Sequence, residues 1–349
     1  MRLLNEHLQA EHSRPSQAAY KWVRNVILVG AILAGIGIYV TPMLSFQALP
    51  KVFPTALPMK EIAELDQTQV AEMIDEIIEP FEIADPSTYD NVNFQMDSQY
   101  ALLINSANGQ VLFEHQADVR TYPASLTKIM TTLIGIEQGG YLDDSVTVSA
   151  DFDALSQAHA MKAGFSYGEV RTLSEILHAI MLSSGAEATW SLAYHVAGNY
   201  EAFVALMNEK ARELGMYDTH FVTTSGLHDE NHYTTAHDMA ILLQYALENP
   251  VFKAIFTAPT YELETPNSRG STLYSTLFRV APRTTFEGGE IMGGRTGFTT
   301  PAGRCLASLA TDGTDEFILI TLGAPDPDFT NHDSHILDAL TIYEYFLGG

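Results

Sequence analysis

A serine and a lysine three positions apart, Ser125 and Lys128, are the residues of this chain best placed to perform chemistry. Side chains at this spacing on a helix project from the same face, so the amine can reach the hydroxyl. Serine attacks a carbonyl poorly until a base removes its proton, and an amine is such a base only when neutral. Burial or a nearby cation lowers the pKa of a lysine and favours that neutral form. The pair therefore predicts a nucleophile with its own base.

The surrounding residues predict the helix that must hold this pair. Pro123 suits a first helical turn, and Gly139-Gly140 is a termination signal. The unpaired N–H groups of a first turn can stabilise an oxyanion. A Ser-x-x-Lys taken alone is usually a solvated pair on an ordinary helix. Here it occurs once in the chain, and apolar residues recur around it at helical spacing: Leu126, Ile129, Met130 and Leu133.

Two further motifs follow in the chain. Ser183-Ser184-Gly185 places hydroxyls in a turn between two predicted helices, which by itself is ordinary turn chemistry. Gly293-Gly294-Arg295-Thr296-Gly297 places a permanent cation and a hydroxyl on a predicted strand, where the glycines let another backbone approach. Such a strand suits the terminal carboxylate of a peptide. The alternative is a surface Arg-Thr pair on an edge strand.

The elements that position these motifs predict an α/β (α+β) fold. Asn108-Gly109 joins two β runs, 100–105 and 110–114, into a hairpin. Side chains that can cap helices stand at Thr172, Asn199 and Thr235, with the helices ending near residues 182, 214 and 247. Strand patterns return at 290–298, 304–311 and 316–322, before a last amphipathic helix at 336–346. We expect an antiparallel sheet built from both ends of the domain, flanked by helices and an all-helical lobe, with the site between sheet and lobe.

Together, the three motifs in this order resemble the signature of penicillin-binding proteins and serine β-lactamases. Residues 98–346 resemble the D-alanyl-D-alanine carboxypeptidases of the low-molecular-mass penicillin-binding class. The resemblance implies removal of the terminal D-alanine from peptidoglycan stem peptides, by acylation of a serine followed by hydrolysis. It implies no cofactor and no metal, and it makes β-lactams covalent inhibitors.

The resemblance also assigns roles by position. It makes Ser125 the nucleophile, Lys128 its base and Ser184 a proton-relay partner. The substrate-binding residues that it implies are Arg295 and Thr296 for the carboxylate, with Gly297 and Phe298 beside them. The backbone N–H groups of Ser125 and Phe298 would form the oxyanion hole.

Two positions depart from the family pattern. The second motif usually reads Ser-x-Asn, but its third position here is Ala186; the third motif usually begins with lysine, but here it begins with Arg295. Loss of the amide favours a second hypothesis, a catalytically impaired domain that acts as a cell-wall binding scaffold. A β-lactamase is a third hypothesis, but the sequence after the second motif has no convincing Glu-x-x-x-Asn arrangement to supply a deacylating glutamate.

Other reactive side chains have simpler interpretations. His228 and His232, with Asp229 and Glu230, lie in a turn-like loop without a fixed ligand spacing, so we expect no metal there. The single cysteine, Cys305, lies in an apolar alternating run and is expected to be a packed core thiol. The net charge of −25, from 43 acidic and 18 basic residues, argues against a nucleic-acid partner.

The N-terminal residues predict a membrane attachment. Residues 25–44 form an apolar run that can span a bilayer, and the basic residues before it place the tail 1–24 in the cytoplasm. Residues 45–95 would then be an extracellular stalk and 96–349 the catalytic domain. A cleaved signal peptide is the rival interpretation, but its charged region would be unusually long and Ser45–Ala48 is a poor cleavage site. We therefore expect a single-pass protein of the cell membrane, with the catalytic domain outside.

Overall fold

The computed structural model describes residues 94–326, 329–330 and 332–348. The predicted cytoplasmic tail, the predicted membrane anchor and most of the predicted stalk lie outside these residues. Among the residues that the structure describes, no helix is both long and apolar enough to cross a bilayer.

The hairpin predicted around Asn108-Gly109 is confirmed. Its strands are β1 (Tyr100–Asn105) and β2 (Val111–His115), and they pair antiparallel. Gly109 has φ +71, a conformation that glycine adopts without a steric penalty. The Asn108 side-chain oxygen accepts a hydrogen bond of 2.9 Å from the N–H of Gln110 and closes the turn.

One antiparallel sheet joins the two ends of the domain. Its strand order is β2-β1-β10-β9-β8-β7, where β7 is Thr285–Phe286, β8 Gly289–Thr299, β9 Gly303–Thr311 and β10 Glu316–Ala324. The N-terminal strand β1 pairs with the C-terminal β10, so that Leu102 lies opposite Ile320. This arrangement confirms the predicted sheet of strands from both ends of the sequence.

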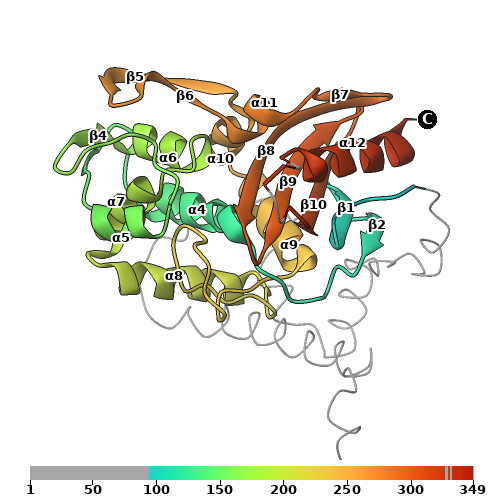
Figure 1. Ribbon diagram of the computed structural model, residues 1–349, viewed down its shortest axis with the longest axis horizontal. Helices are drawn as coiled ribbons and strands as arrows, with labels where there is room; N and C mark the ends of the chain where they lie inside the picture. Colours follow the sequence, from blue (N-terminus) through green and yellow to red (C-terminus); the bar gives the residue numbers. More distant parts are fainter. Residues whose placement is uncertain (1–93, 327–328, 331, 349) are drawn as a thin grey trace, which may run out of the picture. The chain divides into compact units, whose positions relative to one another are not determined.

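The sheet separates two apolar layers. Successive side chains of a strand point to opposite faces, and the buried residues of β1 follow this rule. Leu103 packs in the layer with α12 (Ser334–Leu347), whereas Leu102 packs in the layer with the other helices. Figure 1 shows α12 lying along the sheet on the side away from α4. Cys305 is fully buried in the same layer as Leu102, as expected of a core thiol.

The helices of the lobe begin where the sequence places capping residues. The side chains of Thr172, Asn199 and Thr235 each accept a hydrogen bond from an N–H in the first turn of their own helix. The predicted helical segments are thereby confirmed. The helices are η3 (Ala124–Thr127, a 3₁₀ turn), α4 (Lys128–Gln138), α5 (Phe152–Gln157), α6 (Leu173–Met181), α7 (Ala186–Ala197), α8 (Tyr200–Glu213), α9 (Ala236–Leu247), α10 (Pro250–Thr257) and α11 (Thr276–Val280).

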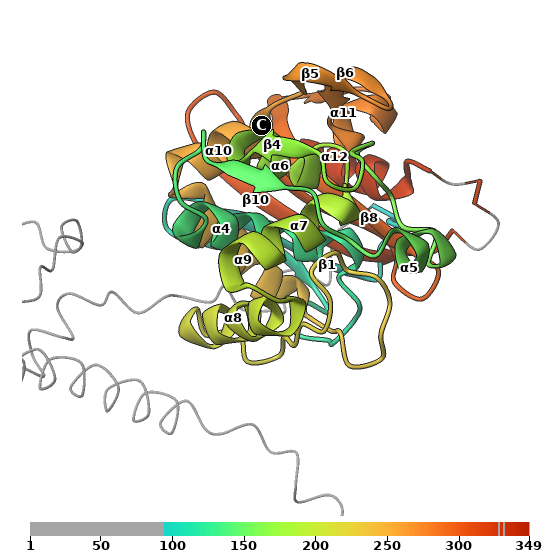
Figure 2. The same ribbon diagram turned by 90° about the vertical axis from the view of Figure 1, so that its left-hand side faces the viewer.

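The prediction of an all-helical lobe is wrong. The lobe contains two small antiparallel sheets, β3 (Ser145–Thr147) with β4 (Val170–Thr172), and β5 (Thr260–Asn267) with β6 (Gly270–Tyr274). Strands β3 and β4 are three residues long, too short for an alternating pattern to stand out. Strands β5 and β6 are mostly exposed on both faces, so their sequences lack a buried stripe. Figure 2 shows β5 and β6 at one end of the domain, next to α11.

Burial of α4 generates a prediction about stability. Leu133 is 1% exposed in the apolar layer around α4. Leu133→Ala should lower the free energy of unfolding by about 2 to 5 kcal/mol, because it removes buried methyl groups and leaves a cavity. Urea denaturation measures this change. Tyr141→Ala, at a side chain 79% exposed, is the control and should change stability by less than about 0.5 kcal/mol. Equal losses in both variants would contradict the assigned core.

Candidate active site

The predicted nucleophile lies in a 3₁₀ turn rather than in an α-helical turn. Ser125 belongs to η3, and α4 begins at Lys128. Ala124, directly before the serine, has φ +47, a strained value for a residue with a side chain. The Thr127 hydroxyl donates a hydrogen bond of 2.8 Å to the Ala124 carbonyl. The turn is therefore held in a backbone conformation that the local sequence would not choose.

A glycine in the loop between α8 and α9 allows that loop to pack closely against the serine turn. Gly226 has φ +80, and a Cβ built on it would lie 1.7 Å from the carbonyl oxygen of Ala124. No other residue fits that approach without movement of the backbone. The loop also supplies a hydrogen-bond acceptor to the site, the carbonyl of Ser225, which accepts from the Lys128 amine at 2.6 Å.

The serine and the lysine are in contact. The Nζ atom of Lys128 lies 3.2 Å from the Oγ atom of Ser125. The lysine side chain is 2% exposed, whereas Ser125 is only partly buried. A ligand can therefore approach the hydroxyl while the amine stays shielded from solvent. This geometry is what a nucleophile and its general base require.

Burial lowers the pKa of Lys128 well below its ordinary value. The nearby positive charge of Arg295 lowers this pKa further, and Glu187 opposes the shift. Glu187 is itself buried, and burial raises its pKa. Its Oε1 atom accepts hydrogen bonds from the N–H groups of Gly164 and Phe165, at 2.9 and 3.2 Å. The two larger influences on Lys128 thus both favour the neutral amine.

The turn of the second motif brings a second serine to the first. Ser184 lies between α6 and α7 with φ +60, again a strained value. Its Oγ atom is 3.2 Å from the Oγ atom of Ser125, so a proton can pass between the hydroxyls. Ala186, in the position of the missing asparagine, is buried, and its N–H donates to the Met161 carbonyl at 2.8 Å. The hydrogen bonds of an asparagine amide are therefore absent from this position.

Arg295 is completely buried. Burial lowers its pKa to about 9, so the guanidinium is still a cation at pH 7. It donates to the carbonyls of Ser125 and Met181, at 3.2 and 3.1 Å, and to the hydroxyls of Thr276 and Ser184. A guanidinium has five N–H donors, so these four bonds leave one. The charge lies beside the site, but most of its donors are used within the protein.

The remaining predicted residues bring β8 against the nucleophile. The Thr296 hydroxyl bonds to that of Thr276 at 2.8 Å, and a Cβ on Gly297 would lie 2.9 Å from the Ser125 nitrogen. The Phe298 ring contacts the Arg304 guanidinium, 4.2 Å from the ring centre. Six of the seven residues predicted from the sequence therefore lie around one point between the sheet and the lobe, whereas the ring of Phe298, next along β8, turns to Arg304. The seven predicted residues are Ser125, Lys128, Ser184, Arg295, Thr296, Gly297 and Phe298.

His232 is a residue of the site that the sequence argument passed over. It is 2% exposed, and its Nδ1 atom accepts from the N–H groups of Val222 and Thr223, at 2.9 and 3.1 Å. The ring proton must then be on Nε2, which lies 2.8 Å from the Thr127 hydroxyl. His232 thereby supports the hydroxyl that holds the Ala124 carbonyl. The sequence suggested His232 only as a candidate metal ligand, and it could not show the contact with Thr127, which is 105 positions away.

His228, the other histidine of this loop, is not part of this buried arrangement. His228 is exposed and meets the Tyr122 ring edge-on, with ring centres 4.7 Å apart. Among the residues that the structure describes, no group of three His, Cys, Asp or Glu side chains could hold a metal ion.

Loss of the His232 contact should slow reaction at Ser125. His232→Ala removes the partner of Thr127, and we expect acylation of Ser125 by a β-lactam to slow by about tenfold or more. His232→Gln can accept from the loop N–H groups and donate to Thr127, so it should restore much of the rate. Stopped-flow measurement of acylation, with melting curves for folding, makes the comparison.

The pH dependence of the acylation rate shows whether His232 acts by positioning the serine turn or by changing its own protonation. Burial lowers the pKa of His232 to about 3, so the ring is neutral across the range in which the enzyme would be assayed. The ratio of wild-type to variant rates should therefore be constant between about pH 6 and 9. A folded His232→Ala that acylates at the wild-type rate, or a ratio that changes through this range, would contradict the positioning role.

Known proteins match the part of the chain that contains this site. The sequence profile described as D-alanyl-D-alanine carboxypeptidase matches residues 86–326. D-alanyl-D-alanine carboxypeptidase DacF of Bacillus subtilis is 33% identical over 67% of this chain and 59% of its own length. DacA of Escherichia coli, of the same description, is 31% identical over 66% of this chain and 57% of its own. The chain thus spans less than two thirds of either relative.

Solved structures agree with this match. The D-alanyl-D-alanine carboxypeptidase of Mycobacterium tuberculosis superposes with a TM-score of 0.61 at 27% identity, over 72% of this chain and 92% of that one. A Streptomyces DD-transpeptidase superposes with a TM-score of 0.64 at 25% identity, over 73% and 98%. With the sheet, the lobe and the profile match in agreement, this chain belongs to the D-alanyl-D-alanine carboxypeptidase family.

Proposed function

We propose that this protein is a serine-type D-Ala-D-Ala carboxypeptidase that trims the terminal D-alanine from peptidoglycan stem peptides. The observation that carries the proposal is the partly exposed hydroxyl of Ser125, 3.2 Å from the buried amine of Lys128. An amine with a lowered pKa can remove the proton of a serine at neutral pH. Family membership names the bond on which that serine would act.

The reaction then follows in two steps. Neutral Lys128 takes the Ser125 proton as the oxygen attacks the carbonyl between the two D-alanines. The tetrahedral oxyanion receives hydrogen bonds from the N–H groups of Ser125 and Phe298. The proton passes through the Ser184 hydroxyl to the leaving nitrogen, and D-alanine departs. Water, deprotonated by the same lysine, attacks the acyl-enzyme, releases the shortened peptide and regenerates Ser125.

Strand β8 offers a place for the peptide backbone. β9 pairs with β8 as far as Thr299, but β7 pairs with it only at Gly289 and Glu290. In the part of the chain that the structure describes, no strand pairs with residues 295–299 on the side of Ser125, and Thr296, Phe298 and Thr299 are partly exposed there, so an extended chain can be added along this edge. We assign the substrate carboxylate to the Thr296 side of this edge, within the field of Arg295. Arg295 is fully buried and would act through its positive field, whereas the partly exposed Thr296 hydroxyl, now bonded to Thr276, is the group that could turn to the carboxylate.

The scaffold and β-lactamase hypotheses remain as outcomes of the test. Ala186 supports the scaffold, since the missing amide removes a hydrogen bond to the substrate, a loss of about 1 to 3 kcal/mol for an unmet partner. The contacts of Lys128 instead favour an active serine. We also propose that residues 25–44 anchor the protein in the cell membrane with residues 96–349 outside, because apolar length and preceding basic charge support this orientation.

Incubation with a β-lactam should add the mass of the drug covalently at Ser125. The strained lactam and its carboxylate imitate the D-Ala-D-Ala terminus, so attack needs only the groups described above. Loss of the adduct should be slow, because Glu187, the carboxylate that acts on Lys128, is fully buried. It is held by the N–H groups of Gly164 and Phe165, and no hydrogen bond joins it to Ser125 in the described residues. Intact-mass spectrometry and peptide mapping measure both stages, alongside release of D-alanine from acyl-D-Ala-D-Ala peptides.

Ser125→Ala is the control and should take up no drug. A lasting adduct together with release of D-alanine supports the carboxypeptidase. Rapid turnover of the drug would instead identify a β-lactamase. A folded protein that gains no adduct at high drug concentration has an inactive site, and the scaffold hypothesis would replace the proposal.

Acylation should rise with pH through the lowered pKa of Lys128 and then level off, because only the neutral amine is a base. Arg295→Gln removes a positive charge that lowers this pKa. The pKa of Lys128 should therefore rise, and the acid limb of the profile should move to higher pH. Arg295→Lys retains the charge and should move it less. Profiles of acylation rate from about pH 5 to 10 test the order, and coincident limbs for wild type and Arg295→Gln would contradict it.

A further inference from the structure

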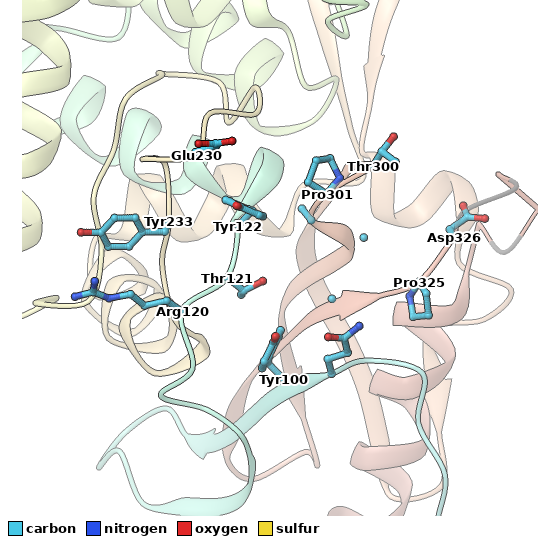
Figure 3. Close-up of a pocket in the computed structure, with 14 residues that line it drawn as sticks. Tyr100, Arg120, Thr121, Tyr122, Glu230, Tyr233, Thr300, Pro301, Pro325 and Asp326 are labelled. Atoms are coloured by element: carbon cyan, nitrogen blue, oxygen red, sulfur yellow. The ribbon is translucent and has the colours of Figure 1, made fainter. Parts of the chain in front are cut away.

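A cavity of about 580 Å³ lies next to the predicted catalytic residues without including them. Neither Ser125, Lys128 nor Arg295 lines it. Figure 3 shows one wall formed by Arg120, Tyr122, Glu230 and Tyr233 and the facing wall formed by Thr300, Pro301, Pro325 and Asp326. Its volume is within the range of sites that bind small molecules or side chains.

The chain connects this cavity to the reaction centre on both walls. Tyr122 stands three residues before Ser125, on the segment that leads into the nucleophile turn. Thr300 and Pro301 directly follow β8, which carries Phe298 to the other side of the same serine. A ligand that extends along β8 beyond Phe298 therefore reaches the cavity next.

The proposed function fixes which end of a peptide would do so, and this inference rests on it. With the terminal carboxylate beside Thr296 and the scissile carbonyl at the N–H of Phe298, the residues before the D-alanines continue toward Thr299 and Thr300. An extended chain advances about 3.3 Å per residue, so the residue before D-Ala-D-Ala comes to the rim of the cavity. Its side chain can then enter.

Most charges in the cavity walls are already balanced. Arg120 pairs with Asp218 at 2.8 Å and stacks on the Tyr233 ring, 4.6 Å from its centre. Asp326 accepts from Arg304 at 2.6 Å. Glu230 is exposed and makes no hydrogen bond or ion pair with any residue that the structure describes. The carboxylate of Glu230 is thus the one unbalanced charge of the lining.

The other lining groups suit an apolar stem that carries a polar end. Two tyrosine rings, of Tyr100 and Tyr122, offer flat apolar faces together with hydroxyls, whereas the ring of Tyr233 points away from the facing wall (Figure 3). The ring of Tyr122 is fixed by the edge of His228. Methylene groups can pack on such rings while a terminal ammonium reaches a carboxylate, as long cationic side chains do in proteins.

We propose that this cavity binds the side chain of the residue that precedes D-Ala-D-Ala, and that Glu230 gives preference to one ending in an ammonium group. The cavity would thus recognise a diamino-acid side chain of the stem peptide. Because the reacting residues do not line the cavity, it affects which peptide is cleaved and leaves the chemistry at Ser125 unchanged.

The test uses two acylated tripeptides that end in D-Ala-D-Ala and differ only at the preceding lysine, whose side-chain amine is free in one and acetylated in the other. Wild-type protein should cleave the free-amine peptide with a kcat/KM about two- to fivefold higher, the upper part of the range that an exposed ion pair gives. Glu230→Gln should bring the ratio close to one. Glu209→Gln removes an exposed carboxylate on α8, outside the cavity, and should leave the ratio unchanged.

A second variant tests the cavity itself. Thr300→Trp places a bulky ring at its exposed rim and should reduce kcat/KM for both tripeptides relative to acyl-D-Ala-D-Ala, which lacks the side chain. Acylation by benzylpenicillin should change by less than about twofold in Glu230→Gln, since the drug carries no ammonium.

The outcomes separate this inference from the proposed function. If D-alanine is released but the ratio in Glu230→Gln equals that of wild type, the cavity does not read the side chain and the inference is overturned. If Thr300→Trp cleaves all three peptides as wild type does, the peptide does not pass the cavity, and the inference again fails. If neither peptide nor drug reacts at Ser125, it is the proposed function that has failed.

Discussion

Two basic side chains, Lys128 and Arg295, are buried close together. The rest of the site offsets the unfavourable free energy of burying them. A charge removed from water is strongly unfavourable unless it is paired or neutralised. The two residues meet this constraint in different ways. Lysine can release its proton, and its lowered pKa shows that burial and the adjacent cation favour release. Arginine keeps its charge and must be solvated by the protein.

The solvation of Arg295 ties together three parts of the chain. Its donors reach the Ser125 turn, the end of α6 and the start of α11 from a strand of the central sheet. A lysine in the same place would offer a compact ammonium with three donors, whereas the planar guanidinium spans more acceptors. Replacement of the family's lysine by arginine therefore strengthens the framework around the serines while it reduces the donors left for a substrate. Specific recognition then depends more on the open edge of β8.

Most of the fold could be predicted from the sequence, because it depends on local signals, and the three motifs marked the segments that the structure brings together. Asn108-Gly109 specifies a turn, and Thr172 or Asn199 caps the helix that follows it. The remainder depends on contacts between distant segments. Nothing near Ala124 predicts its positive φ, which is held by Thr127 and by the closeness of Gly226. The burial of the Arg295 side chain could not be predicted either, since a strand pattern does not tell which distant segments will pack around a given side chain.

The strained residues show why those distant contacts matter for chemistry. Ala124 and Ser184 both have positive φ, and they hold the two hydroxyls of the site 3.2 Å apart. Such strain persists only where surrounding structure determines the backbone more strongly than local preference does. Here the surrounding structure is the buried network of His232, Thr127 and Arg295. The same burial that lowers the pKa of Lys128 thus also surrounds the serine turn, so that the amine and the two hydroxyls are held in contact by the fold itself. Under the proposed function, binding then need not supply the free energy of ordering these groups, and the affinity for a peptide can be set by the groups along β8 and beyond it.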